Sequence, residues 1–191
     1  MITIEILQEH GIVAALYGMG LSYGKTSDVD FKKFCWPMDK ENIYFRLRDK
    51  AAELAQNDTG ENKFLEHVMV WLLVRAPRHW WQEADTYRIS SKQSESTMHT
   101  LMSKPLTQED FSSPIPEPYL EYLNTLIEMK QEDLLRDSLP EGYLQRREWV
   151  LSYKELRHIY HQRKDHRKKE WREFCKFLVK NLECPEYLMP L

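Results

Sequence analysis

Cysteine is scarce in this sequence: Cys35, Cys175 and Cys184 are the three cysteines among 191 residues, and they form no CxxC pair. An odd and scattered set is typical of reduced thiols in the cytoplasm rather than of a disulfide framework. None of the three stands in a setting that indicates a nucleophile. We therefore expect a cytoplasmic protein with no cysteine nucleophile.

Long apolar runs and a strong net charge are also missing. No run of about eighteen apolar residues exists, so no membrane span is expected. The first segment, MITIEILQEHG at 1–11, is too acidic and too interrupted for a signal peptide. The net charge is −3 and 42% of the residues are hydrophobic, which is ordinary globular composition. Nucleic acid is therefore not an expected partner, and any anion site must be built from a few arginines.

Phosphate-loop and metal motifs are absent as well. The segment YGMGLSYGK at 17–25 only imitates a glycine-rich phosphate loop, because it lacks the spacing that a P-loop needs. His158, His161 and His166 suggest a metal cluster at first sight, but they are three and five residues apart. A zinc helix needs HExxH or two histidines four residues apart, so no metal is expected.

Hydrophobic periodicity predicts a mixture of strands and helices. Strands are predicted over 1–11 and 66–77, and the polar stretch up to residue 100 is a loop or a strand. The proline-rich segment 112–118 is a loop or hinge. We predict an α+β fold with a small central antiparallel-type sheet flanked by helices, as a single domain over 1–191. Helices are predicted within 12–28, 39–58, 78–88, 118–138, 153–163 and 168–182, and 139–152 is a break plus a short helix or strand.

Arginines stand beside several polar segments. Arg88 opens the stretch RISSKQSES, Arg136 precedes a Leu-Pro turn, and Arg163 ends YKELRHIYHQR. A guanidinium suits a phosphate or a uracil carbonyl, and serine hydroxyls with loop N–H groups complete an anion cradle. For each arginine taken alone, an ordinary surface position is the favoured interpretation. His67, at the entrance to a predicted buried strand, is either a satisfied strand-edge residue or a side chain that faces a pocket.

A series of short motifs resembles one enzyme family, the flavin-dependent thymidylate synthases, in order and spacing over roughly residues 40–180. That family methylates dUMP without a cysteine nucleophile. Its motifs are a FEH strand entry, a KAP-type turn, an RHRxxSxNExSxRY signature, RxxLP, and NxRxLxxFxxxR followed by QWE. The matching segments here are LEH at 65–67, RAP at 75–77, TYRISSKQSESTMH at 86–99, RDSLP at 136–140, SYKELRHIYHQR at 152–163 and KEWREF at 169–174.

The resemblance implies roles for residues outside the signature. Arg136 and Arg163 match the arginines that contact dUMP, and the arginine at the Arg163 position polarises the uracil, which is electrostatic rather than covalent catalysis. His67 matches the histidine near the flavin and the folate. Ser152 and His158 fall where the family often has asparagines that approach the flavin.

Within the signature, the resemblance implies that Ser91 and Ser96 bind the substrate, whereas Arg88 and Gln93 bind the cofactor. Arg88 stands at the second arginine of the signature, and Gln93 replaces its asparagine. Two of the three signature arginines, which help to hold FAD and the nucleotide phosphate, are lost. A charge-assisted hydrogen bond typically contributes about 1.5–3 kcal/mol, so these losses are expected to lower the affinity for FAD. The departures, in order, are Thr86, Tyr87, Ser94 and Met98.

Three functions remain open at this stage. The first is an enzyme that methylates dUMP or a related pyrimidine nucleotide, with FAD, NADPH and methylene-tetrahydrofolate, and that works as a homotetramer with sites shared between subunits, as the resemblance implies. The second is a nucleotide-binding protein on the same fold that has lost its flavin, which would suit a small phage-like genome. The third is a structural homo-oligomer whose arginines form salt bridges between subunits.

Overall fold

The computed structural model describes residues 2–25, 40–57, 60–96 and 100–189. The chain divides into two compact units. Unit 1 comprises Met1–Glu5 and Leu72–Trp149, and unit 2 comprises Ile6–Trp71 and Val150–Leu191. The expectation of a single domain over 1–191 stays a prediction.

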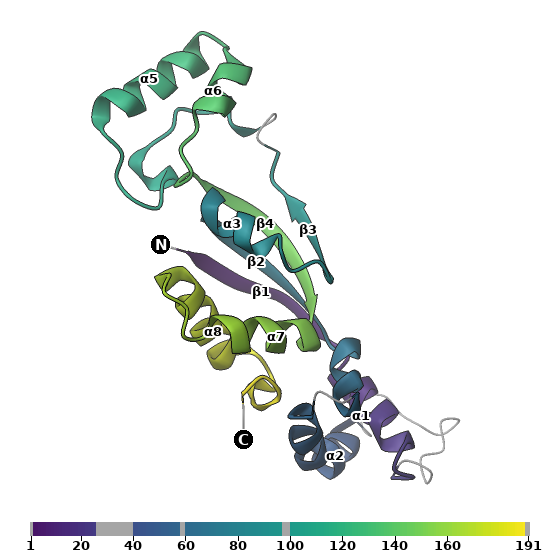
Figure 1. Cartoon of the computed structure of the whole chain (residues 1–191). Coiled ribbons are helices and arrows are strands. Elements are labelled where there is room, and N and C mark those ends of the chain that lie inside the picture. Colours follow the sequence, from purple (N-terminus) through teal and green to yellow (C-terminus); the bar gives the residue numbers. More distant parts are fainter. Residues whose placement is uncertain (1, 26–39, 58–59, 97–99, 190–191) are drawn as a thin grey trace. The chain divides into compact units, whose positions relative to one another are not determined.

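A four-stranded antiparallel sheet in the order β1-β2-β4-β3 forms the centre of the fold, and helices flank it (Figure 1). This confirms the predicted α+β class. The elements, in chain order, are β1 (Thr3–His10), α1 (Ile12–Leu21), α2 (Lys40–Ala55), η1 (Glu61–His67), β2 (Met69–Pro77), α3 (Arg78–Ala84), β3 (Ser90–Ser94), η2 (Gln108–Asp110), α5 (Glu117–Glu128), α6 (Glu132–Ser138), β4 (Leu144–Ser152), α7 (Tyr153–Arg163), α8 (Lys169–Asn181) and η3 (Pro185–Tyr187).

The strands form where the sequence alternates or is continuously apolar. Along β2, Val70, Leu72 and Val74 are fully buried, while the residues between them are half-buried. Side chains of a strand alternate between its two faces, so this pattern gives β2 one fully buried face and one partly covered face. The predicted strands at 1–11 and 66–77 are confirmed, and the polar segment before residue 100 contains the short strand β3.

The single helix predicted over 118–138 is wrong, because two helices occupy it. The helix α5 ends at Glu128, and Lys130 adopts a left-handed conformation with φ 56°. The backbone N–H after Lys130 donates to the Leu126 carbonyl at 2.9 Å, which is the pattern of a Schellman cap. The break shifts the buried stripe by one residue: Leu134 is 49% exposed and Leu135 is buried. Figure 1 shows α6 beside α5 in unit 1.

An aromatic cluster forms part of the core of unit 1. Trp80 and Trp81 of α3 meet Trp149 of β4, with ring centroids 5.0–6.0 Å apart in edge-to-face arrangements. The indole N–H of Trp81 donates to the Gln145 carbonyl at 2.9 Å. Edge-to-face pairs are the arrangement that aromatic quadrupoles prefer, so the tryptophans are core residues here rather than a stacking platform for bases.

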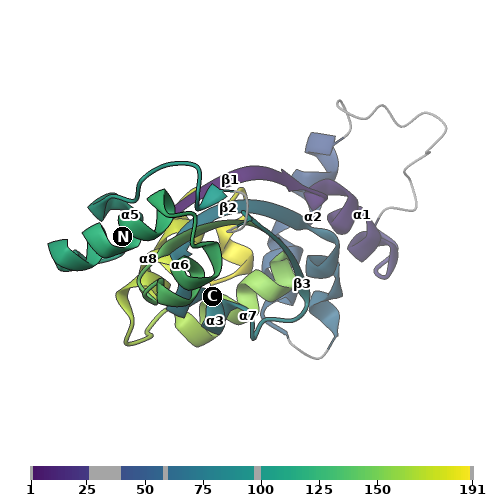
Figure 2. The same cartoon turned by 90° about the horizontal axis from the view of Figure 1, so that it is seen from above.

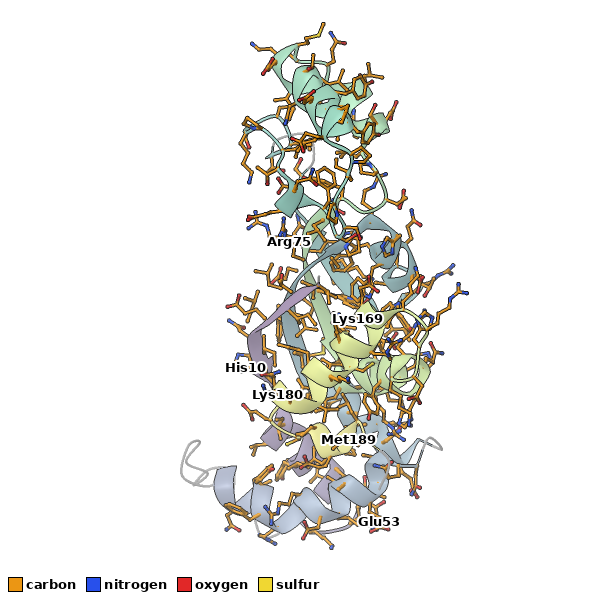
Figure 3. The ribbon with its side chains drawn as sticks, turned by 90° about the vertical axis from the view of Figure 1, so that its left-hand side faces the viewer. His10, Glu53, Arg75, Lys169, Lys180 and Met189 are labelled. Carbon is orange, nitrogen blue, oxygen red and sulfur yellow. The ribbon has the colours of Figure 1, made fainter. Side chains whose placement is uncertain are left out.

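Helices dominate unit 2. The helix α1 packs against α2 and η1, and α7 packs against α8 (Figure 2). Figure 3 shows Met189 close to α2, which carries Glu53. The side-chain amide of Gln56, just after α2, donates to the Met189 carbonyl at 2.8 Å. The C-terminal segment is therefore fixed to this helix within unit 2.

A partly buried polar cluster also fixes the C-terminal segment of unit 2. The hydroxyl of Tyr153 donates to the carboxylate of Glu9, and the backbone N–H of Glu183 donates to both oxygens of that carboxylate at 3.1 and 3.2 Å. The backbone N–H of Cys184 donates to the Tyr153 hydroxyl at 3.2 Å. Burial raises the pKa of Glu9 above its ordinary value, although the hydrogen bonds from Tyr153 and Glu183 act in the opposite direction.

Candidate functional site

The predicted site residues are distributed over the two units, and each group is considered by itself. Unit 2 carries His67, Ser152, His158 and Arg163, whereas unit 1 carries Arg88, Ser91, Gln93, Ser96 and Arg136.

His67 lines a cavity in unit 2. The cavity has a volume of about 510 Å³, which lies in the range of about 300–1,000 Å³ that is typical of small-molecule sites. Helix α1, the turn after it and η1 form the walls. Glu61, Lys63 and His67 contribute polar side chains, and Tyr23 contributes an aromatic ring. Of the two interpretations of His67, the structure supports the one in which it faces a pocket.

Gly11 sets the backbone beside His67. It has φ 102°, and a Cβ atom at this position would lie 2.3 Å from the carbonyl oxygen of His67. Both the positive φ and the close approach require glycine. Gly18, which also lines the cavity, is different: a Cβ there would meet no described atom within 4 Å.

Ser22 also lines the cavity, and residues 20–24, GLSYG, match the GxSxG pattern of a hydrolase nucleophile. That nucleophile needs a sharp turn from a strand into a helix. Ser22 instead follows the C-terminal end of α1, with ordinary right-handed dihedral angles of −62° and −20°. The backbone context therefore does not support a serine hydrolase.

Ser152 and His158 make local contacts on α7. Ser152 is 9% exposed, and its hydroxyl accepts a hydrogen bond from the backbone N–H of Glu155 at 3.2 Å, so it caps the helix. His158 is exposed, and its Nε2 lies 3.0 Å from the side-chain amide nitrogen of Gln162. The cofactor roles of Ser152 and His158 stay predictions.

Arg163, the last residue of α7, is half-buried against the start of α8. The carbon at the centre of its guanidinium lies 4.6 Å from the ring centroid of Trp171, and Trp171 is 0% exposed. Its Nη1 lies 3.0 Å from Nε2 of His166. A cation on an aromatic face with a hydrogen bond at one end has little rotational freedom, so this arginine is pre-organised.

In unit 1, the polar signature segment forms the strand β3 beside β4 (Figure 1). The carboxylate of Glu95 accepts from the backbone N–H of Arg146 at 2.9 Å and from its Nε at 3.0 Å. Ser91 and Gln93 are exposed on β3. Ser96 is half-buried, and its carbonyl accepts from the backbone N–H of residue 100 at 3.0 Å.

The positions that depart from the signature are used by the fold of unit 1. Tyr87 is 4% exposed, and its ring centroid lies 6.5 Å from that of Trp149. The hydroxyl of Thr86 donates to the carbonyl of Glu83 at 2.6 Å. Ser94 is exposed at the end of β3, and Met98 lies outside the described residues. Where the family has a histidine, Tyr87 is thus a core ring. Where the family has an arginine, the hydroxyl of Thr86 makes a local hydrogen bond.

Lys92 and Asp85 tie the same segment to the aromatic cluster. The Nζ of Lys92 lies 4.9 Å from the ring centroid of Trp149, 3.6 Å from Asp85, and 3.4 Å from the Tyr87 carbonyl. Asp85 also accepts from Arg147 at 3.1 and 3.2 Å. Arg88, between these groups in sequence, is exposed. Arg88 is therefore more exposed than Lys92, whose side chain is 13% exposed.

Arg136 lies on α6 and pairs with Asp133 one turn earlier. Asp133 is highly exposed and Arg136 is half-exposed, so this ion pair contributes little stability and is easily exchanged for a ligand. The substrate contact of Arg136 stays a prediction.

Two buried thiols are unsuited to nucleophilic chemistry. Burial raises the pKa of Cys175 and Cys184 to about 12, so both are protonated at neutral pH. Cys35 lies outside the described residues. Within the described ranges, no group of three or more His, Cys, Asp or Glu side chains could hold a metal ion. The same ranges contain no helix with the length and apolar character needed to cross a bilayer.

Several residues that shape these groups were missed from the sequence. Lys63 and Tyr23 line the cavity, Lys92 anchors the signature segment, and His166 contacts Arg163. Of these residues, His166 had a signal in the sequence, because it lies three residues after Arg163 and so can be close to it in space. The others come together through packing between elements that are distant in sequence.

No protein-family model matches the sequence, and no curated protein sequence matches it. Solved structures do match. Thymidylate synthase X from Helicobacter pylori, solved with FAD and dUMP, matches with TM-score 0.72 and 18% identity over 98% of this chain and 97% of that one. A second structure of that enzyme, described as a flavin dependent thymidylate synthase complexed with FAD and dUMP, matches with TM-score 0.70 and 19% identity over 97% and 96%.

A third similar structure is PolB, a UMP/dUMP methylase from Streptomyces cacaoi bound with 5-Br dUMP. It matches with TM-score 0.69 and 14% identity over 98% of this chain and 94% of that one. At such identities the likeness defines the fold and not the activity. The chain therefore has the fold of the flavin-dependent thymidylate synthases over nearly its whole length.

Proposed function

We propose that this protein binds dUMP or a related pyrimidine nucleotide and methylates its base, with FAD as the redox cofactor and with methylene-tetrahydrofolate and NADPH as co-substrates. The observation that carries this proposal is Arg163, held on Trp171 and half-buried, at the position that polarises the uracil in the family that the sequence resembles. The fold likeness to structures that contain FAD with dUMP, or a bromo-dUMP, supports it.

In this proposal the chain's own residues bind and orient the nucleotide. Arg163 donates hydrogen bonds to a pyrimidine carbonyl and stabilises the negative charge that develops there. Arg136, freed from its exposed ion pair, contacts the nucleotide phosphate together with Ser91 and Ser96. We also propose a homotetramer in which subunits share sites.

The residues present fit FAD in part. The cavity that His67 and Lys63 line has room for an aromatic ring system and offers donors to it. In unit 1, Arg88 is exposed and available for a phosphate. Gln93, Ser152 and His158 complete the proposed cofactor contacts. When bound, a flavin supplies hydride transfer.

A second candidate, nucleotide binding without turnover, is favoured by one specific observation. Tyr87 and Thr86, at positions where the family carries a histidine and an arginine, are engaged in the core and in a local hydrogen bond. They therefore do not replace the lost contacts to the FAD phosphates. On this alternative, Arg163 and Arg136 still bind a nucleotide.

The test is the visible absorption spectrum of the purified protein with and without added FAD, followed by thermal-shift titration with dUMP. Flavin bands that stay with the protein through gel filtration, and stabilisation by dUMP, are expected for the synthase. No bound flavin at saturating FAD would exclude it. Stabilisation by dUMP without flavin, abolished by Arg163→Ala, would establish the second candidate.

A further inference from the structure

The connection between α7 and α8 is folded tightly around His166. The backbone N–H of His166 donates to the carbonyl of Arg163 at 3.0 Å. From α8, Nη1 of Arg172 donates to the carbonyls of His166 and Arg167 at 2.6 and 2.8 Å. The backbone at His166 is thus held by hydrogen bonds to both helices.

Two contacts of the His166 ring are with groups that donate hydrogen bonds. Nε2 lies 3.0 Å from Nη1 of Arg163, and Nδ1 lies 3.3 Å from the backbone N–H of Lys168. A guanidinium has donors and no acceptor, and a backbone N–H likewise donates. A neutral imidazole has one acceptor nitrogen and can satisfy one of these contacts at a time, and the shorter one is to Arg163. A protonated imidazole has no acceptor, and it adds a positive charge beside the guanidinium.

The connection between α7 and α8 is rich in cationic side chains. Asp165 in the same connection carries the opposite charge. Charged and titratable groups on the two helices and their connection include Tyr160 and Arg163 from α7, Lys164, Asp165, Arg167 and Lys168 from the connection, and Arg172 and Cys175 from α8.

We propose that His166 is a positioning residue for nucleotide binding: its neutral ring holds the Arg163 guanidinium on Trp171, and protonation of the ring releases it. The inference rests on the proposed role of Arg163 in binding a pyrimidine nucleotide. Trp171 provides the flat surface, and His166 fixes the rotation of the guanidinium on that surface. Nucleotide affinity therefore falls as His166 takes up a proton.

The test compares dUMP dissociation constants, measured by calorimetry on the full chain from about pH 8 to about pH 5.5, across the range in which imidazoles ordinarily titrate. In His166→Gln, the amide oxygen keeps an acceptor near the Nε2 position at every pH. The wild type is expected to lose at least fivefold more affinity on acidification than His166→Gln. His166→Ala is expected to bind weakly at every pH.

The phosphate of dUMP also titrates in this range, but it does so equally in all variants. His10→Gln is the matched control, because it removes another imidazole of unit 2, one whose ring packs edge-on against Trp71. This control should keep the wild-type pH response. The proposal is overturned if His166→Gln keeps the wild-type pH response, or if His166→Ala binds dUMP as the wild type does.

A second measurement needs no nucleotide and separates failure of this inference from failure of the proposed function. The NMR titration of the His166 ring is recorded in the wild type and in Arg163→Met. Removing the guanidinium should raise the midpoint of that titration, because a neighbouring cation disfavours the protonated ring. An unchanged midpoint overturns the coupling whether or not dUMP binds. If the midpoint rises in Arg163→Met but the wild type does not bind dUMP, the coupling between His166 and Arg163 is supported and the proposed function is contradicted.

Discussion

The two groups of predicted site residues differ in what their side chains already do. In unit 2, His67 lines a cavity and Arg163 is held on the face of Trp171 in a half-buried position. In unit 1, the departures from the family signature are absorbed into the fold: Tyr87 is a core ring and Thr86 makes a local hydrogen bond. On the proposed function, Arg163 is still placed to bind a nucleotide, whereas Tyr87 and Thr86 no longer offer contacts to the FAD phosphates.

The largest expected effect concerns the backbone beside His67. Gly11→Ala places a Cβ 2.3 Å from the His67 carbonyl oxygen at a positive φ. Strain and overpacking together are expected to lower the free energy of unfolding by about 2–4 kcal/mol. Thermal and urea denaturation measure it. Gly18→Ala is the control, since a Cβ there meets no described atom within 4 Å and alanine favours a helix. Equal destabilisation by both changes would contradict this geometry.

Arg163→Ala should have the largest effect on binding. Loss of a charge-assisted hydrogen bond typically costs about 1.5–3 kcal/mol, which is a roughly 10–100-fold weaker Kd for dUMP. Calorimetric titration measures it. Lys164→Ala removes the same charge from the next residue, which lies over Tyr160, and should change the Kd less than about twofold. Parallel losses in the two variants would mean that net charge, and not a specific contact, controls affinity.

Tyr87→His restores the family residue but should damage unit 1. A buried ring next to Trp149 is replaced by a smaller polar one, with an expected loss of about 1–3 kcal/mol in the free energy of unfolding. Chemical denaturation followed by tryptophan fluorescence measures the change. A stable Tyr87→His protein that gains FAD would show that the position faces a ligand after all.

Thr86→Arg restores a signature arginine at an exposed position. Stability should change by less than about 0.5 kcal/mol, whereas FAD affinity should improve by about tenfold if a phosphate contact is regained. Equilibrium dialysis with FAD measures the affinity, and Thr86→Gln is the uncharged control. No gain with arginine would mean that loss of this signature arginine does not limit FAD affinity.

The smallest expected effect is a pH dependence of stability at Glu9. Its pKa is raised in the folded state, chiefly by burial, so the folded protein binds this proton more tightly than the unfolded chain does. The contribution of Glu9 to stability is therefore more favourable at low pH, and it declines as pH rises from about 4.5 through the raised pKa. Relative to Glu9→Gln, the wild type should lose stability over that window. A wild type that gains stability relative to Glu9→Gln would contradict the sign.

The sequence predicted the strands and most helices because their periodicity depends on local residue order. It missed the break at Lys130, where a left-handed cap forms without the glycine that usually marks it. The motif series selected Arg163 and His67, but motif position carries no information on neighbours in space. Whether Tyr87 faces a ligand or Trp149, and what holds Arg163, depends on packing between distant segments.

The most direct test of the central claim is tritium release from dUMP and UMP labelled at C5, in the presence of FAD, NADPH and methylene-tetrahydrofolate. Methylation at C5 displaces that hydrogen. We predict release by the wild type and loss of release in Arg163→Ala. FAD and nucleotide that both bind the wild type without any release of tritium would contradict the proposed methylation and leave a nucleotide-binding protein.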